Sequence, residues 1–235
     1  MLIDHFANEP MPQNLGDAII SLARESVIPL SPVPIERSSP LYPILEAEVT
    51  AKLVDAFRNM AMPPQIDLAG GRVETGITEV VVAINETEQG AELAGFTLYK
   101  PRLPVSDSAS ITYAVVAEKY RRQGVLRRMF AKIMQDYPAI GLDCEVELVP
   151  VWIRLGFKVA SQQGCHIAME SAPLAGKNWM MTDTMLSRIP IVMEARQMVQ
   201  QLYSEQRLKA EQAVAEKRGI EAAERFMAST SIKPN

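Results

Sequence analysis

Between residues 110 and 137 the spacing of the apolar side chains changes from that of a β-strand to that of an α-helix. Residues 110–117 are rich in β-branched and aromatic side chains, which favour a strand. A charged turn containing Gly124 follows, and apolar residues then recur every three or four positions, at Val125, Met129 and Ile133. The pattern therefore predicts a strand, a tight turn and a helix of three to four turns.

Other segments extend this order along the chain. Apolar spacing predicts a helix over residues 45–60, strands over 77–85 and 91–100 joined as a hairpin, a strand over 139–148, a short helix over 149–155, and strands near 157–160 and 166–170. Strands that precede and follow helices in this way predict an α/β (α+β-like) fold with mixed strand directions in the sheet and flanking helices.

Composition divides the chain into three parts. Residues 1–43 carry seven prolines, so we expect a mostly extended N-terminal arm with one short helix over residues 14–24. Residues 44–172 form the expected α/β domain. Residues 173–235 form a C-terminal extension, in which Thr184–Ala228 is rich in strong helix formers. Its apolar residues do not keep a clean heptad, which favours packing on the domain or on a protein partner, with homo-oligomerisation as the alternative.

The overall composition is that of a soluble globular protein. Of 235 residues, 48% are hydrophobic and 22% charged, and the net charge is -4, which argues against a nucleic-acid binder. No apolar run reaches the length of a membrane span, and no secretory leader is recognised at the N-terminus. We therefore expect a cytoplasmic protein without a membrane partner, whose two cysteines, Cys144 and Cys165, are reduced.

The turn before the predicted helix has the chemistry of an anion site. A helix N-terminus leaves N–H groups unbonded and carries a partial positive charge, which suits phosphate oxygens. Gly124 lets a ligand approach the backbone, and the turn adds fixed positive charge at Arg121, Arg122, Arg127 and Arg128. The alternative is a plain strand-to-helix turn with a solvated basic face.

The run Val116-x-x-x-Tyr120-Arg121-Arg122-Gln123-Gly124-Val125 resembles motif A of the GNAT superfamily of N-acetyltransferases, written Arg/Gln-x-x-Gly-x-Gly/Ala. Arg121 and Gly124 match the first two fixed positions, and Leu126 departs from the small residue at the third. The resemblance implies a mixed, mostly antiparallel GNAT-type sheet and a loop whose backbone amides hold the pyrophosphate of acetyl-CoA. It places the cofactor-binding residues at Val115, Val116, Arg121, Arg122, Gln123, Gly124, Val125, Leu126 and Arg127.

A second run, Leu155-Gly156-Phe157, is similar to the closing signature of the same superfamily, and Gly156 is expected to cap the short helix in a left-handed conformation. Trp152 stands where many members carry a tyrosine that acts as general acid. An indole cannot supply a proton to a departing thiolate as a phenol can.

Catalytic candidates follow from the chemistry of amine acylation. Glu145 and Glu147, expected on the strand over 139–148, are candidates for the general base, because a carboxylate beside apolar surface has a raised pKa. Tyr113 is a candidate proton donor. The alternatives are a solvated strand edge for the carboxylates and packing for the tyrosine. No paired His or Cys spacing indicates a metal site.

Two functions remain in competition. The first is an N-acyltransferase that moves an acetyl or related acyl group from acyl-CoA to an amine acceptor, which the sequence does not identify. The second is a catalytically weak or inactive CoA-binding module that acts in protein binding or assembly through its helical tail.

Overall fold

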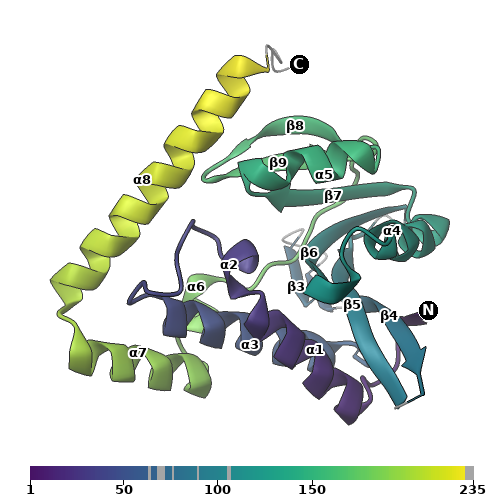
Figure 1. Ribbon diagram of the computed structural model, residues 1–235, viewed down its shortest axis with the longest axis horizontal. Helices are drawn as coiled ribbons and strands as arrows, with labels where there is room; N and C mark the ends of the chain where they lie inside the picture. Colours follow the sequence, from purple (N-terminus) through teal and green to yellow (C-terminus); the bar gives the residue numbers. More distant parts are fainter. Residues whose placement is uncertain (63–64, 68–71, 76, 89, 105–106, 231–235) are drawn as a thin grey trace. The chain divides into compact units, whose positions relative to one another are not determined.

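The computed structural model (Figure 1) describes residues 1–62, 65–67, 72–75, 77–88, 90–104 and 107–230. The chain forms two units whose segments alternate along the sequence. Unit 1 comprises Met1–Glu25, Leu53–Leu142 and Ser171–Met180, and unit 2 comprises Ser26–Lys52, Asp143–Glu170 and Met181–Asn235.

The strands form one seven-stranded sheet, in the order β1-β4-β5-β6-β7-β9-β8, and a separate pair, β2-β3. Pairing is antiparallel for β1–β4, β4–β5, β5–β6 and β8–β9 and parallel for β6–β7, so the prediction of a mixed, mostly antiparallel sheet is confirmed. The strands are β1 (Leu2–Phe6), β2 (Gln65–Asp67), β3 (Arg72–Thr75), β4 (Glu79–Thr87), β5 (Gly90–Pro101), β6 (Ser108–Val116), β7 (Ala139–Cys144), β8 (Lys158–Gln163) and β9 (His166–Glu170).

The core of unit 1 is built on β4 and β5. Val80, Val81, Val82 and Ala83 of β4 are completely buried, so neither face of this strand is open to solvent. The helices α1 (Gln13–Glu25) and α4 (Val125–Asp136) both pack on β5. Met129 of α4 lies against Thr97, with 3.9 Å between the sulfur and the hydroxyl oxygen. This packing fixes the start of α4 at the end of β6.

Unit 2 is mainly helical around the β8–β9 hairpin. Its helices are α2 (Val27–Leu30), the first part of α3 (Tyr42–Asn59), α5 (Val149–Arg154), α6 (Asp183–Leu186), α7 (Pro190–Leu202) and α8 (Glu205–Ser229). The long helix α8 packs on β8 and β9. Gly219 permits this approach, because a Cβ there would lie only 2.7 Å from the Cβ of Cys165 and 2.9 Å from the Cδ of Pro34.

Two sequence expectations need correction. Residues 1–43 are not mostly an extended arm: β1 pairs with β4, and α1 and α2 follow it. Local proline content did not reveal β1, because its pairing partner lies far along the chain. The strand expected over 139–148 ends at Cys144, so Glu145 follows the strand and Glu147 lies in the 3₁₀ turn η2 (Val146–Leu148).

The helical extension is confirmed as α6, α7 and α8, although its last five residues lie outside the described ranges. The division of the chain at residues 43 and 172 stays a prediction. None of the described helices combines the length and the apolar composition that a membrane crossing requires.

Candidate functional site

The turn between β6 and α4 has the backbone geometry that exposes a helix N-terminus. Gly124 is the N-cap of α4 and has a φ of 74°, in the left-handed region that glycine adopts without strain. No side chain caps this end of the helix. A Cβ built on Gly124 would meet no atom within 4 Å. Open space therefore adjoins Gly124 at the start of α4, and the N-cap itself supplies no side chain that would compete for the first N–H groups of the helix.

The turn is anchored to the β4–β5 hairpin by polar side chains. The Tyr120 hydroxyl donates to Oε2 of Glu92 at 2.8 Å and accepts from Nδ2 of Asn85 at 3.1 Å. Lys119 forms an ion pair with the same Glu92, whose pKa is lowered by the hydrogen bonds from Lys119 and Tyr120. These contacts could not be predicted from the sequence, because the local pattern of the turn does not indicate which residues about thirty positions away its side chains will contact.

Further hydrogen bonds act within the turn itself. Arg121 Nε donates to the carbonyl of Val116 at 3.1 Å, and Gln123 Nε2 donates to the carbonyl of Lys119 at 2.8 Å. Arg128 Nη2 donates to the carbonyl of Gln123 at 3.2 Å. The exposed Arg122, at a φ of 62°, makes no side-chain hydrogen bond or ion pair with any described residue. Its guanidinium is thus available to an external anion.

The remaining residues expected to bind the cofactor differ in what they can offer. Val115 and Val125 are buried, so only their backbone groups could face a ligand, whereas Val116 and Leu126 are half-buried and Arg127 is exposed. The parallel pairing of β6 with β7 joins Ser108–Ser110 to Ala139–Gly141, and β6 runs on beyond it to Val116. The pairing of β6 with β7 is thus confined to the end of β6 remote from the turn.

The catalytic candidates lie in different units. Tyr113 belongs to unit 1 and is buried, whereas Glu145 and Glu147 belong to unit 2. Burial raises the pKa of Glu145, and the nearby charge of Glu147 raises it further. Glu147 is exposed. The catalytic roles of all three stay predictions.

The closing motif has the predicted helix cap. Gly156 has a φ of 97°, its N–H donates to the carbonyl of Ile153, and the N–H of Phe157 donates to the carbonyl of Trp152, which is the Schellman arrangement. The buried Trp152 ring packs edge-on against Phe157, with ring centroids 5.5 Å apart. Trp152 therefore serves the packing of unit 2.

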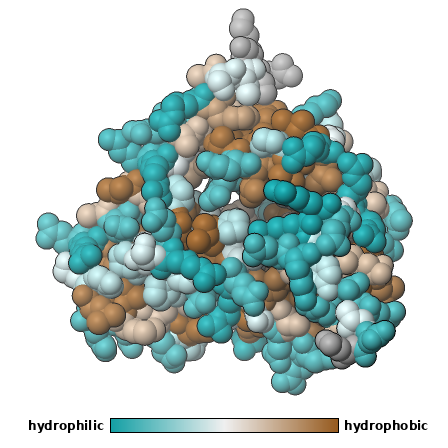
Figure 2. Space-filling model, in the orientation of Figure 1, coloured by the Kyte–Doolittle hydropathy of each residue, from teal (hydrophilic) through white to brown (hydrophobic). Residues whose placement is uncertain are grey.

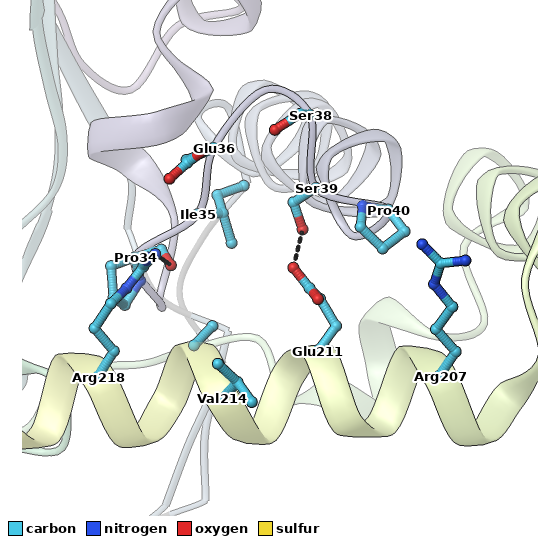
Figure 3. Close-up of a pocket in the computed structure, with 11 residues that line it drawn as sticks. Pro34, Ile35, Glu36, Ser38, Ser39, Pro40, Arg207, Glu211, Val214 and Arg218 are labelled. Carbon is cyan, nitrogen blue, oxygen red and sulfur yellow. Dashed lines mark hydrogen bonds between the residues drawn. The ribbon is translucent and has the colours of Figure 1, made fainter.

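Unit 2 also contains a half-open pocket of about 280 Å³ between residues 34–40 and α8 (Figure 3). Two hydrogen bonds join residues that line it on opposite sides. Arg218 donates to the carbonyl of Pro34 at 2.6 Å, and the Ser39 hydroxyl donates to Glu211 at 3.3 Å. Arg218 and Glu211 thus hold residues 34–40 against α8. Among the described residues no three His, Cys, Asp or Glu side chains gather as a metal site.

Comparisons with known proteins give similarity at the level of structure. No protein-family model matches the sequence, and neither does any curated protein. Solved structures that resemble the chain include an acyl-CoA N-acyltransferase from Pseudomonas aeruginosa, at 13% identity over 73% of this chain and 100% of that one, with a TM-score of 0.48. An aminoglycoside 6'-acetyltransferase type Ii matches at 14% identity over 74% of this chain and 100% of that one, with a TM-score of 0.49.

A third solved structure is an aminoglycoside 6'-N-acetyltransferase complexed with coenzyme A. It is 13% identical, over 74% of this chain and 99% of that one, with a TM-score of 0.48.

Proposed function

We propose that this protein binds the pyrophosphate of an acyl-CoA at the turn before α4 and transfers the acyl group to an amine. The observation that carries the proposal is the uncapped N-terminus of α4 behind Gly124, which combines free N–H groups, the positive end of the helix dipole and the Arg122 guanidinium. Arg121 adds a second exposed positive charge.

The motif resemblance supplies the remainder of the binding mode. The backbone of β6 near Val115 and Val116 lies beyond the pairing with β7 and leads directly into the turn. It would hold the pantetheine arm and the acyl carbonyl, and Gln123 and Val125–Arg127 would border the pyrophosphate. Bound acyl-CoA supplies an activated thioester.

The reaction needs few catalytic groups from the protein. The acceptor ammonium must lose a proton to become an amine, which attacks the thioester carbonyl. The C–N bond forms as the C–S bond breaks, the nitrogen loses a second proton, and the CoA thiolate takes up a proton. Glu145 is the favoured base, because its pKa is raised and so lies closer to the pH at which a general base has to work. Glu147 and Tyr113 are the other candidates, as base and proton donor respectively.

One observation favours a second function, that of a CoA-binding module with little or no turnover. Trp152, at the position where the resemblance places a tyrosine acid, is a buried packing residue that carries no titratable proton. In this alternative the CoA site is kept, and the helical extension of unit 2 binds a protein partner.

Calorimetric titration with acetyl-CoA tests the binding step. The chain offers a matched pair of variants, Gly124→Trp and Gly164→Trp, because both glycines have positive φ (74° and 59°) and open space where a side chain would start. We expect Gly124→Trp to abolish binding and Gly164→Trp, in the β8–β9 turn, to retain it. Equal losses in both variants, or no binding by the wild type, would overturn the pyrophosphate assignment.

Turnover then separates the two functions. Release of free thiol from acetyl-CoA in the presence of a panel of amines is expected for the transferase, with a large fall in kcat for Glu145→Gln. Saturable binding without thiol release for any amine would favour the binding module.

A further inference from the structure

One pair of charged side chains on α8 differs from the other such pairs of that helix. The surface over α8, along the upper left of Figure 2, is mostly hydrophilic. Oppositely charged residues four positions apart lie side by side on a helix and commonly form ion pairs. In α8 the ion pairs of this kind are Glu205–Lys209 at 2.6 Å, Lys217–Glu221 at 3.9 Å and Glu221–Arg225 at 4.0 Å. Arg207 and Glu211 have the same spacing, but in the described part of the chain neither belongs to an ion pair.

Each of these two side chains is held by a different neighbour, and both line the pocket between residues 34–40 and α8. Arg207 lies over the Tyr203 ring, with 4.7 Å between its guanidinium carbon and the ring centroid. Oε1 of Glu211 accepts a hydrogen bond from the Ser39 hydroxyl at 3.3 Å. Figure 3 shows both side chains extending from α8 toward residues 34–40, with their charged ends apart. The pocket therefore presents one cation and one anion that do not neutralise each other.

Both groups keep bonding capacity for a ligand. No described residue accepts a hydrogen bond from the Arg207 guanidinium, and none donates to the second carboxylate oxygen of Glu211. A guanidinium presents a fork of N–H donors that suits a carboxylate, and a carboxylate accepts hydrogen bonds from an ammonium group. The Cβ atoms of such neighbours on a helix are about 5–6 Å apart. The two groups therefore suit a ligand whose own opposite charges are only a few bonds apart.

The rest of the lining has no net charge and is partly apolar. Arg218 and Glu36 add one charge of each sign, and the apolar members are Pro34, Ile35, Pro40, Val214 and Ala215. A simple anion would meet carboxylates here and a simple cation would meet guanidinium groups, whereas a zwitterion can match both signs. Val214 is 66% exposed, so its side chain can still gain from contact with an apolar group.

The size of the pocket limits the ligand. Its volume of about 280 Å³ lies at the lower end of the roughly 300–1,000 Å³ that is typical of pockets for drug-sized ligands. A molecule the size of an amino acid therefore suits it better than a nucleotide does. Because the pocket is half open, such a ligand stays partly in contact with water, and its affinity should be modest.

We infer that this pocket binds a free α-amino acid with an apolar side chain. The Arg207 guanidinium binds the carboxylate of the ligand, and Glu211 binds its ammonium group. The apolar side chain of the ligand lies between Val214 on α8 and Ile35 on the opposite wall. The site lies in unit 2 alone, and its occupation is independent of the proposed acyl transfer.

Ligand-detected NMR titration of the full chain with L-leucine, isocaproate and isoamylamine tests the need for both charges. Isocaproate is leucine without its ammonium group, and isoamylamine is leucine without its carboxylate. We expect a Kd on the order of 1 mM for leucine, and at least about tenfold weaker binding of both analogues, because each lacks one charged partner. Glycine, which lacks the apolar side chain, should bind about threefold to tenfold more weakly than leucine. Equal affinity for isocaproate or inorganic phosphate would identify a plain anion site and overturn the inference.

Variants of α8 test whether leucine binds in this pocket. Arg207→Gln and Glu211→Gln each remove one charge and should weaken leucine binding at least about tenfold; the glutamine at the second position keeps an oxygen that can accept from Ser39. Lys217→Gln and Glu221→Gln are the matched controls, because they remove one charge of each sign from the same helix outside the pocket lining. Both controls should bind leucine as the wild type does, and thermal melting should confirm that all of these variants fold. No leucine binding by the wild type at about 20 mM, or equal weakening in the pocket variants and the controls, would overturn the inference.

Discussion

A buried carboxylate in unit 1 makes a quantitative prediction about stability. Glu79, at the start of β4, is 5% exposed and accepts three hydrogen bonds. Tyr137 donates to its Oε1 at 2.6 Å, and Tyr99 and His5 Nε2 donate to its Oε2 at 2.8 and 2.9 Å. Burial, and after it the Glu79 carboxylate, raises the pKa of both tyrosines, so their protons stay in place at neutral pH.

The replacement Glu79→Gln keeps the shape and removes the charge. A hydrogen bond to a charged group contributes about 1.5–3 kcal/mol and a neutral one about 0.5–1.5 kcal/mol. The NH₂ group of glutamine cannot accept the bond or bonds made to the oxygen that it replaces, and the remaining bonds lose their charge, so the replacement should cost at least about 3 kcal/mol of unfolding free energy at pH 7. The control is Glu86→Gln, on the same strand but exposed, which should change stability little.

The effect should depend on pH in a defined direction. Burial alone would raise the pKa of Glu79, but the hydrogen bonds from His5, Tyr137 and Tyr99 outweigh it and lower the pKa below its ordinary value. The stability that Glu79 contributes is therefore present above the unfolded pKa of about 4.3 and is lost as the pH falls through the lower, folded pKa. The difference in unfolding free energy between wild type and Glu79→Gln should therefore shrink as the pH falls from about 5 to about 3, an interval that includes the unfolded pKa of about 4.3.

Urea unfolding followed by tryptophan fluorescence measures this difference. The chain has two tryptophans, of which Trp179 lies in unit 1 and Trp152 in unit 2, so a Trp152→Phe background for both wild type and variant reports on unit 1 alone. A difference that is independent of pH, or no larger than that of Glu86→Gln, would refute the reasoning.

Two further predictions concern the thiols and the turn. Burial raises the pKa of the Cys144 thiol to about 12. A thiol reagent at mildly alkaline pH should therefore label the half-buried Cys165 first, which peptide mass analysis would measure. Equal labelling rates of the two cysteines would contradict this prediction. Tyr120→Phe removes the hydroxyl that joins the turn to Glu92 and Asn85, and we expect the calorimetric Kd for acetyl-CoA to rise about threefold to tenfold. An unchanged Kd would show that the turn is held in place without this hydroxyl.

Local sequence was sufficient to predict the strand, turn and helix of the candidate site. The change of apolar period around Gly124 places the end of β6 and the start of α4 to within two residues, because both elements bury one regular face. The same holds for Gly156, whose place at the end of an apolar helix demands a left-handed residue.

Features that depend on distant partners could not be predicted. β1 is too short to stand out beside the prolines that follow it, and only its pairing with β4 reveals it. Glu145 and Glu147 alternate with apolar residues as in a strand, but four residues of such a pattern fit the single turn of η2 equally well. In α7, apolar residues occur on most sides of the helix, and only packing separates the buried row from the exposed one.

The contacts of the turn bear on the affinity expected of the proposed anion site. The side chains that fix its shape, Lys119 and Tyr120, bond to the β4–β5 hairpin, whereas the N–H groups at the start of α4 and the Arg122 guanidinium take no part in this anchoring. A site whose shape is set by other residues loses little conformational entropy when the ligand arrives. Residues that do not touch the ligand should therefore affect its affinity. Replacing Lys119 or Tyr120 should weaken binding, as replacing the arginines of the turn should.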